Sequence, residues 1–218
     1  MTRPRAPGPI AQLGAAAALL LLGASCATTP PPPLPVPPPP EAPVPALPEP
    51  LPDVAPCRHV ERIEVRKGER RLRAHCEGGA VVELVVALGR DDTGPKLRAG
   101  DWRTPEGRYR IAGPARPSRF HLFLPIDYPS VEDAERALAE GRLSRADHRR
   151  ILDAHARGAR PPADTALGGD LGFHGEGERW RGDSLHLDWT YGCVALSDPD
   201  LDFLVERVDP ETIVEIAP

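Results

Sequence analysis

The chain has 218 residues, a formal net charge of −5 at pH 7, 29 prolines and four cysteines. Its arginines are interspersed with acidic residues and form no basic stripe, which excludes the usual means of binding a phosphate backbone, so we expect no nucleic-acid partner.

Residues 1–25 have the pattern of an export signal. Arg3 and Arg5 precede an apolar run over residues 15–22, which is too short to span a bilayer and ends in small residues. The order Gly-Ala-Ser before Cys26 resembles a bacterial lipoprotein signal, in which the cysteine becomes the lipidated amino terminus. That resemblance implies a membrane partner through a lipid anchor, and Ala27 after the cysteine favours the outer membrane. The alternative is an ordinary secreted protein in which Cys26 has no such role.

Residues 26–56 form a proline-rich segment, with 15 prolines between positions 30 and 56. No periodicity in this segment can bury a face, so we expect an extended tether. At ~3.1 Å per residue, the 27 residues from 30 to 56 would reach about 80 Å if fully extended.

Residues 57–218 are long enough for one domain with its own core. Alternating apolar residues predict strands over 60–65, 71–75 and 81–88, with turns at 67–68 and 77–79. This hairpin brings Cys57 and Cys76 into one neighbourhood. A two-residue turn would place Cys57 opposite Gly78, so a disulfide between the cysteines requires a longer turn or a bulge.

The rest of the domain alternates short strands with a few helices. We expect a proline turn and a short strand within 100–111, strands at 120–124, 171–174, 193–196 and 213–216, and a short C-terminal helix over 199–208. Ser130 and Ser144 each begin a helical segment, ending near 141 and 158, within an insertion over 132–163. The predicted fold class is mainly β, a sheet or sandwich with a helical insertion.

The segment Thr190-Tyr191-Gly192-Cys193 combines a thiol with neighbouring glycine, and His174-Gly175 precedes it. A thiolate attacks carbonyl carbon, and an imidazole is the usual group that removes the thiol proton. The adjacent glycines allow close approach of a substrate and of amide donors. His186 is the competing base. A buried structural cysteine is the alternative reading of Cys193.

A zinc site built from His174, His186 and Cys193 is an alternative to this interpretation. The chain lacks HExxH and CxxC patterns, and it has no phosphate-binding loop, so we expect neither a metal nor another cofactor.

These motifs together resemble the L,D-transpeptidase catalytic domain family (YkuD-type), bacterial enzymes that crosslink peptidoglycan. The resemblance includes Asp101-x-x-Thr-Pro-Glu-Gly-x-Tyr109, His174-Gly175 and Thr190-x-Gly-Cys193. The run Asp-Trp-Thr-x-Gly-Cys-Val-Ala-Leu over 188–196 is typical of one subgroup. Ser118, His121, Tyr128 and Pro129 also match the pattern of that subgroup.

The resemblance implies a role for each residue of the motifs. Cys193 is the expected nucleophile and His174 the expected base, oriented by the Gly175 carbonyl. Backbone N–H groups of Gly192 and Cys193 are the candidate oxyanion donors, with Thr190 in support. The candidate substrate contacts, each with an equally plausible structural role, are His121, Tyr128, Asp188 and Trp189.

Peptidoglycan stem peptides are the implied substrate, and export to the periplasm is the implied localisation. Ala195 departs from the many members that carry Arg two residues after the cysteine, so the acceptor is open between an amine and water. The implied reaction is transpeptidation, with carboxypeptidase or amide hydrolase activity as the alternative of the same chemistry. A non-catalytic cell-wall binding module is the alternative of another class. The sequence makes no prediction of oligomeric state.

Overall fold

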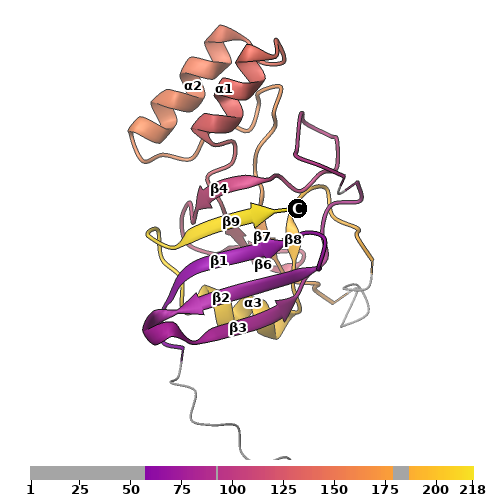
Figure 1. Ribbon diagram of the computed structural model, residues 1–218, viewed down its shortest axis with the longest axis vertical. Helices are drawn as coiled ribbons and strands as arrows, with labels where there is room; N and C mark the ends of the chain where they lie inside the picture. The colour runs from indigo at the N-terminus through magenta and orange to yellow at the C-terminus, as the bar shows by residue number, and fades with distance from the viewer. Residues whose placement is uncertain (1–56, 92, 179–186) are drawn as a thin grey trace, which may run out of the picture. The chain divides into compact units, whose positions relative to one another are not determined.

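The computed structural model describes residues 57–91, 93–178 and 187–218 (Figure 1). All described residues belong to one compact unit. The expected signal peptide, the lipidation site Cys26, the tether and His186 lie outside the described residues. No helix in the described ranges has the length and apolar character needed to cross a membrane.

The first sheet has five strands in the order β3-β2-β1-β9-β4. Strands β1, β2 and β3 form an antiparallel meander, while β9 runs parallel to β1 and antiparallel to β4. Buried and half-buried side chains alternate along β2 and β9, as expected for a sheet with one face in the core. The bounds are β1 Val60–Arg66, β2 Arg71–Cys76, β3 Val81–Val85, β4 Gly107–Arg110 and β9 Ile213–Ala217.

The second sheet has four strands in the order β5-β6-β7-β8. Strands β5, β6 and β7 pair antiparallel, and the short β8 runs parallel to β7. The bounds are β5 Arg116–Ser118, β6 His121–Pro125, β7 Gly172–His174 and β8 Val194–Ala195. Helix α3, Asp198–Val205, contacts β6 and β7.

One apolar core joins the two sheets, and Figure 1 shows β6, β7 and β8 behind the first sheet. The first sheet contributes Ile63, Leu72 and Val214, which are fully buried. Strands β7 and β8 contribute Phe173 and Val194 to the same cluster. This burial is the dominant favourable term for such a domain, and it fixes β7 and β8, the two strands beside the site described below.

Helices α1, Val131–Ala139, and α2, Arg145–Ala156, pair beyond the β4 edge of the first sheet (Figure 1). Ser130 and Asp133 form a reciprocal capping box at the start of α1, and Ser144 accepts the Asp147 N–H at the start of α2. The two helices share a small core of Ala134, Ala137, Leu143, Ile151 and Leu167. The prediction of a mainly β fold with a helical insertion and a short C-terminal helix is confirmed.

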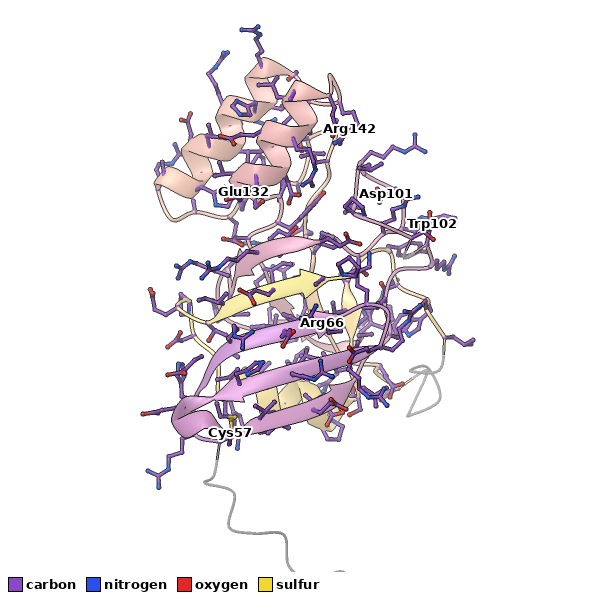
Figure 2. The ribbon with its side chains drawn as sticks, in the orientation of Figure 1. Cys57, Arg66, Asp101, Trp102, Glu132 and Arg142 are labelled. Carbon is purple, nitrogen blue, oxygen red and sulfur yellow. A yellow bond between two sulfur atoms is a disulfide. The ribbon has the colours of Figure 1, made fainter. Side chains whose placement is uncertain are left out.

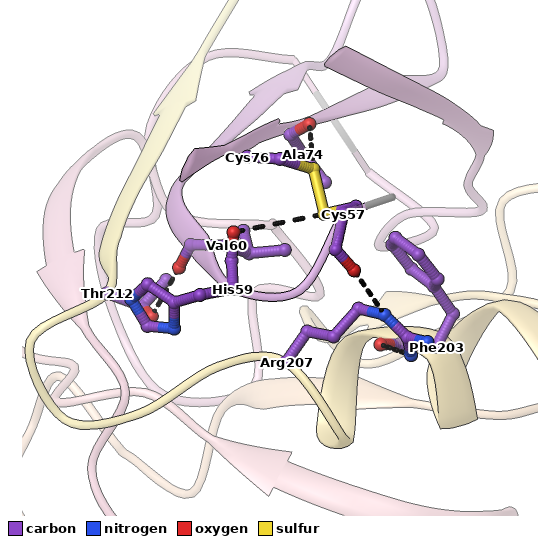
Figure 3. The surroundings of a disulfide bond; sticks show 8 residues. All are labelled: Cys57, His59, Val60, Ala74, Cys76, Phe203, Arg207 and Thr212. Carbon is purple, nitrogen blue, oxygen red and sulfur yellow. Dashed lines mark hydrogen bonds between the residues drawn. A yellow bond between two sulfur atoms is a disulfide. The ribbon is translucent and has the colours of Figure 1, made fainter. Parts of the chain in front are cut away.

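Some boundaries differ from the sequence expectation. The first hairpin turns over four residues, 67–70, and its register shifts between Val60 and Arg62, so Val60 lies opposite Cys76. This longer turn and bulge bring Cys57 to Cys76, and the two are joined by a disulfide with a Cα–Cα distance of 5.3 Å (Figure 3). Arg207 Nε donates to the Cys57 carbonyl at 2.9 Å, which fixes the start of the domain.

Two other elements end or begin earlier than predicted. Strand β3 ends at Val85 because the next residues leave β2 and cross to the second sheet, where Ala87 pairs with Ala195. Helix α3 begins at Asp198 because the Ser197 side chain accepts the Asp200 N–H, and it ends at Val205.

Candidate active site

Cys193 and His174 are brought together by two adjacent parallel strands. Phe173 of β7 pairs with Val194 of β8, and His174 pairs with Ala195. Cys193 comes directly before β8. Because side chains alternate along a strand, Cys193 and His174 belong to the same face of the sheet. The pairing predicted from the two motifs therefore corresponds to neighbouring positions in the fold.

The Cys193 thiol is half-buried and is the free cysteine of the described residues. Its Sγ lies 4.0 Å from the Asp170 carbonyl oxygen. Desolvation raises the pKa of Cys193 to about 11, against smaller lowering effects from the Gly172 backbone and the charge of Lys96. The raised pKa favours the protonated thiol of Cys193 at neutral pH.

His174 is 5% exposed, and its Nδ1 lies 2.7 Å from the Gly175 carbonyl oxygen. A carbonyl only accepts, so Nδ1 carries the proton and Nε2 has the lone pair of a base. Burial lowers the pKa of His174, and nearby Arg119 lowers it further, while the hydrogen bond to Gly175 opposes both. The imidazole is thus neutral at pH 7, the state that can accept a thiol proton.

Two aromatic rings fix the plane of the imidazole. Phe120 stacks on His174 with 4.9 Å between ring centroids, and Trp189 meets it edge-on at 5.3 Å. Phe120 and Trp189 also contact each other at 5.2 Å. Phe120 belongs to no motif in the sequence, so its place beside the base was not predicted.

Asp198, the first residue of α3, fixes the backbone that follows His174. Its Oδ1 accepts the N–H groups of Glu176 at 2.8 Å and Gly177 at 3.1 Å. A Cβ at position 175 would lie 2.2 Å from this oxygen. Glycine at position 175 therefore lets the Asp198 carboxylate approach the loop whose carbonyl holds the His174 imidazole.

The loop before Cys193 is built around the Thr190 hydroxyl. Thr190 Oγ1 donates to the Cys193 carbonyl at 2.6 Å and accepts the Gly192 N–H at 3.1 Å. Gly192 has φ +124°, and a Cβ there would lie 2.6 Å from the Arg103 carbonyl oxygen. The Gly192 N–H is used inside the loop, contrary to its expected part in an oxyanion hole, which leaves the Cys193 N–H as the candidate donor.

Tyr128 and Asp188 have structural contacts where substrate contacts were expected. Tyr128 is 2% exposed, and its hydroxyl donates to the Leu167 carbonyl at 3.3 Å within the core. Asp188 Oδ2 lies 2.6 Å from Arg70 Nη2, and its Oδ1 accepts the Leu88 N–H at 2.9 Å. Both residues support the loops around the site and do not line it.

His121 and Trp189 lie closer to the base. His121 Nε2 is 2.6 Å from Asp202 Oδ1 on α3, which ties β6 to that helix. Trp189 borders the imidazole directly. Of the four candidate substrate contacts, Trp189 is the one whose ring contacts the His174 imidazole.

Asp101 organises a loop that sequence reasoning had identified only as part of a motif. Its carboxylate accepts the N–H groups of Leu97, Arg98 and Arg103 at 2.7, 3.0 and 3.2 Å. It also pairs with Lys96, 4% exposed, at 2.6 Å. Figure 2 shows Asp101 and Trp102 side by side on this loop. The loop thus brings the buried Lys96 charge within range of the thiol.

The described residues contain no group of three or more ligands that could hold a metal ion. The chemistry available to this set of side chains is a thiol nucleophile, a neutral imidazole and backbone donors, which together suit acyl transfer.

Comparison with known proteins assigns the chain to a family of catalytic domains. The family described as the L,D-transpeptidase catalytic domain, YkuD, matches residues 60–216. No curated protein matches the chain. Among solved structures, Bd1075 of Bdellovibrio bacteriovorus is 19% identical, with TM-score 0.45, and the match covers 73% of this chain and 48% of that one.

Two further solved structures are L,D-transpeptidases. The Mycobacterium smegmatis enzyme is 12% identical with TM-score 0.41, covering 73% of this chain and 59% of the other. The Enterococcus faecium enzyme is 14% identical with TM-score 0.42, covering 73% and 50%. The chain spans about half the length of these solved structures.

Proposed function

Because the chain belongs to the L,D-transpeptidase catalytic domain family, we propose that it transfers the acyl group of a peptidoglycan tetrapeptide stem through a thioester on Cys193. The observation that carries the proposal is the pairing of β7 with β8, which places Cys193 on the same face as a histidine whose Nδ1 is held by Gly175.

In the first half-reaction, Cys193 Sγ attacks the carbonyl that joins the third stem residue to the terminal D-Ala. His174 Nε2 takes the thiol proton as the S–C bond forms. The negative charge that develops on the carbonyl oxygen is stabilised by the Cys193 N–H. When the C–N bond breaks, the protonated His174 returns the proton to the leaving amine, and D-Ala departs.

In the second half-reaction, an acceptor amine attacks the thioester carbonyl and loses a proton to His174. The C–S bond breaks, and the proton passes to Cys193 Sγ, so thiol and imidazole return to their starting forms. A preformed ion pair is not required, since burial favours the neutral forms of both groups.

Hydrolysis is the second candidate function, and Ala195 favours it. Ala195 is fully buried, and no cation extends from this position to bind a substrate carboxylate. If water replaces the acceptor amine, the same thioester gives carboxypeptidase or amide hydrolase activity on peptidoglycan peptides or on their links to lipoproteins.

The test is incubation of the purified protein with tetrapeptide-bearing muropeptides, followed by mass analysis. Cys193→Ala is the matched inactive variant, and His121→Gln is the control for a histidine outside the reacting pair. Crosslinked products support transfer, and loss of D-Ala or of a crosslink without joining supports hydrolysis. If the wild-type and Cys193→Ala proteins give the same products, both reactions are contradicted and a non-catalytic binding module is the remaining function.

We further propose that residues 1–25 direct export, that Cys26 carries a lipid anchor in the outer membrane, and that residues 26–56 tether the catalytic domain 57–218 in the periplasm. The support is the sequence pattern alone. A Cys26→Ser variant should move from the membrane fraction to the soluble periplasmic fraction. Unchanged membrane association of this variant would contradict the anchor.

A further inference from the structure

Two exposed aromatic side chains converge beside the candidate active site from loops far apart in the sequence. Trp102 is 44% exposed and Tyr191 is 58% exposed, with 6.2 Å between their ring centroids and 57° between the ring planes. The Arg90 guanidinium lies 5.4 Å from the first ring and 5.2 Å from the second. Arg90 makes no ion pair among the described residues, and its Nε donates to the Trp189 carbonyl at 3.3 Å.

The exposed position of Trp102 requires an unfavourable backbone conformation. Its φ is +58°, a conformation that a bulky residue rarely adopts. The surrounding loop enforces that conformation, because the Trp102 carbonyl accepts the Asp91 N–H at 3.3 Å and its oxygen lies 2.1 Å from the position that a Cβ of residue 89 would take. Trp102 contacts Tyr191 and Arg90 but leaves 44% of its surface exposed, so burial of the ring offsets only part of the cost of the strained backbone. Such strain is typical of ligand-binding positions.

Trp102, Tyr191 and Arg90 form a surface, here called the platform, that lies within reach of Cys193. Tyr191 precedes Cys193 by two residues, so their Cα atoms are at most about 7 Å apart. In a stem peptide, three residues separate the sugar from the scissile carbonyl, a span of at most about 10 Å. A substrate whose carbonyl lies at Cys193 can therefore place its sugar over the Trp102 and Tyr191 rings.

The chemistry of the platform suits a sugar. A pyranose ring has apolar C–H faces that stack on aromatic rings and polar edges that hydrogen-bond. Trp and Tyr present flat apolar surfaces with polar tips, and the remaining Arg90 N–H groups can donate to hydroxyl or acetamido oxygens. An acidic ligand would bind Arg90 as an ion pair and would not need two rings.

We propose that Trp102, Tyr191 and Arg90 bind an N-acetylated amino-sugar ring of the glycan strand that carries the stem peptide. The inference rests on the proposed function, because it takes the ligand from the proposed substrate. It assigns a glycan-binding surface to the chain in addition to its peptide chemistry.

The test compares two donors, a disaccharide-tetrapeptide and the same tetrapeptide without sugar. We expect the full-length protein to use the disaccharide donor with a higher kcat/KM, and Trp102→Ala to lower the ratio of the two kcat/KM values about tenfold, chiefly through KM. Trp102→Phe should restore most of the ratio. Val81→Ala removes an equally exposed apolar side chain from β3 and should leave the ratio unchanged.

Equal losses on both donors, or no loss on either, would overturn the glycan assignment. A separate binding measurement distinguishes this failure from failure of the proposed reaction. An N-acetylglucosamine tetrasaccharide is titrated into Cys193→Ala protein by calorimetry, with and without Trp102→Ala. Binding that Trp102→Ala weakens supports the platform even if neither donor reacts, and absence of binding overturns it.

Discussion

The Cys193 thiol should resist alkylation at neutral pH far more than an ordinary cysteine does. Burial raises its pKa to about 11, so the thiolate fraction at pH 7.5 is about 3 in 10,000 by the ionisation equilibrium. A solvent-exposed cysteine with a pKa of ~8.5 is about one-tenth thiolate at that pH. Because alkylation requires the thiolate, the expected rate is on the order of 10²-fold lower than that of an unstructured thiol.

The assay is iodoacetamide alkylation between pH 6 and 11, with the Cys193 peptide quantified by mass spectrometry in a Cys26→Ser background. The rate should rise with pH across the whole range without a plateau below pH 9. His174→Gln should abolish turnover and leave the shape of this profile unchanged. A plateau below pH 8 that disappears in His174→Gln would refute the reasoning, because it would reveal a preformed thiolate–imidazolium pair.

Three further predictions concern the frame of the site. Replacing both Cys57 and Cys76 by Ser opens a crosslink across a sequence separation of 19 and should cost about 3 kcal/mol. This should lower the Tm by about 6–12 °C in calorimetry, and an unchanged Tm under non-reducing conditions would contradict it. Gly192→Ala places a Cβ 2.6 Å from the Arg103 carbonyl oxygen, at a residue whose φ is strained for alanine. The kcat should therefore fall at least tenfold. A kcat equal to that of the wild type would disprove the close fit. Asp198→Ala removes the acceptor for two backbone N–H groups that follow His174. It should lower the free energy of unfolding by about 1–3 kcal/mol in urea unfolding and should lower kcat in turnover assays. An unchanged unfolding free energy together with an unchanged kcat would count against this role of Asp198.

The strands were predictable where one face of a sheet is buried, because alternation in the sequence then records the fold. The meander β1-β2-β3 is such a case, with Ile63 and Leu72 buried on its inner face. The end of β3 was not predictable in the same way. Ala87 continues the apolar run, but it leaves the first sheet to pair with Ala195, a partner far away in the sequence. Apolar residues indicate burial and do not indicate which sheet they join.

In the candidate site, too, features that are local in the sequence were predictable and features that depend on distant partners were not. His174 and Cys193 were identifiable because their chemistry and glycine context are local. Tyr128 also matched a motif, yet it is buried in the core, since a motif position does not specify whether a ring lines a cleft or supports it. Phe120 and Lys96 could not be found from the sequence, because their effect on the reacting pair depends on loops that only the fold brings together.

In the proposed reaction, Ala195 affects which acceptor attacks the thioester and does not affect how the thioester forms. Ala195 lies opposite His174 in the parallel register and is fully buried, so this position supplies no charge to the site. The charge that favours the Cys193 thiolate comes from Lys96, which Asp101 already neutralises at 2.6 Å. A weak net field gives a substrate carboxylate little attraction, and half-buried Cys193 remains accessible to water. Amine and water then compete for one thioester by mass action. The ratio of crosslinked to hydrolysed product should therefore rise in proportion to acceptor concentration, and a ratio that stays constant would require a dedicated acceptor site.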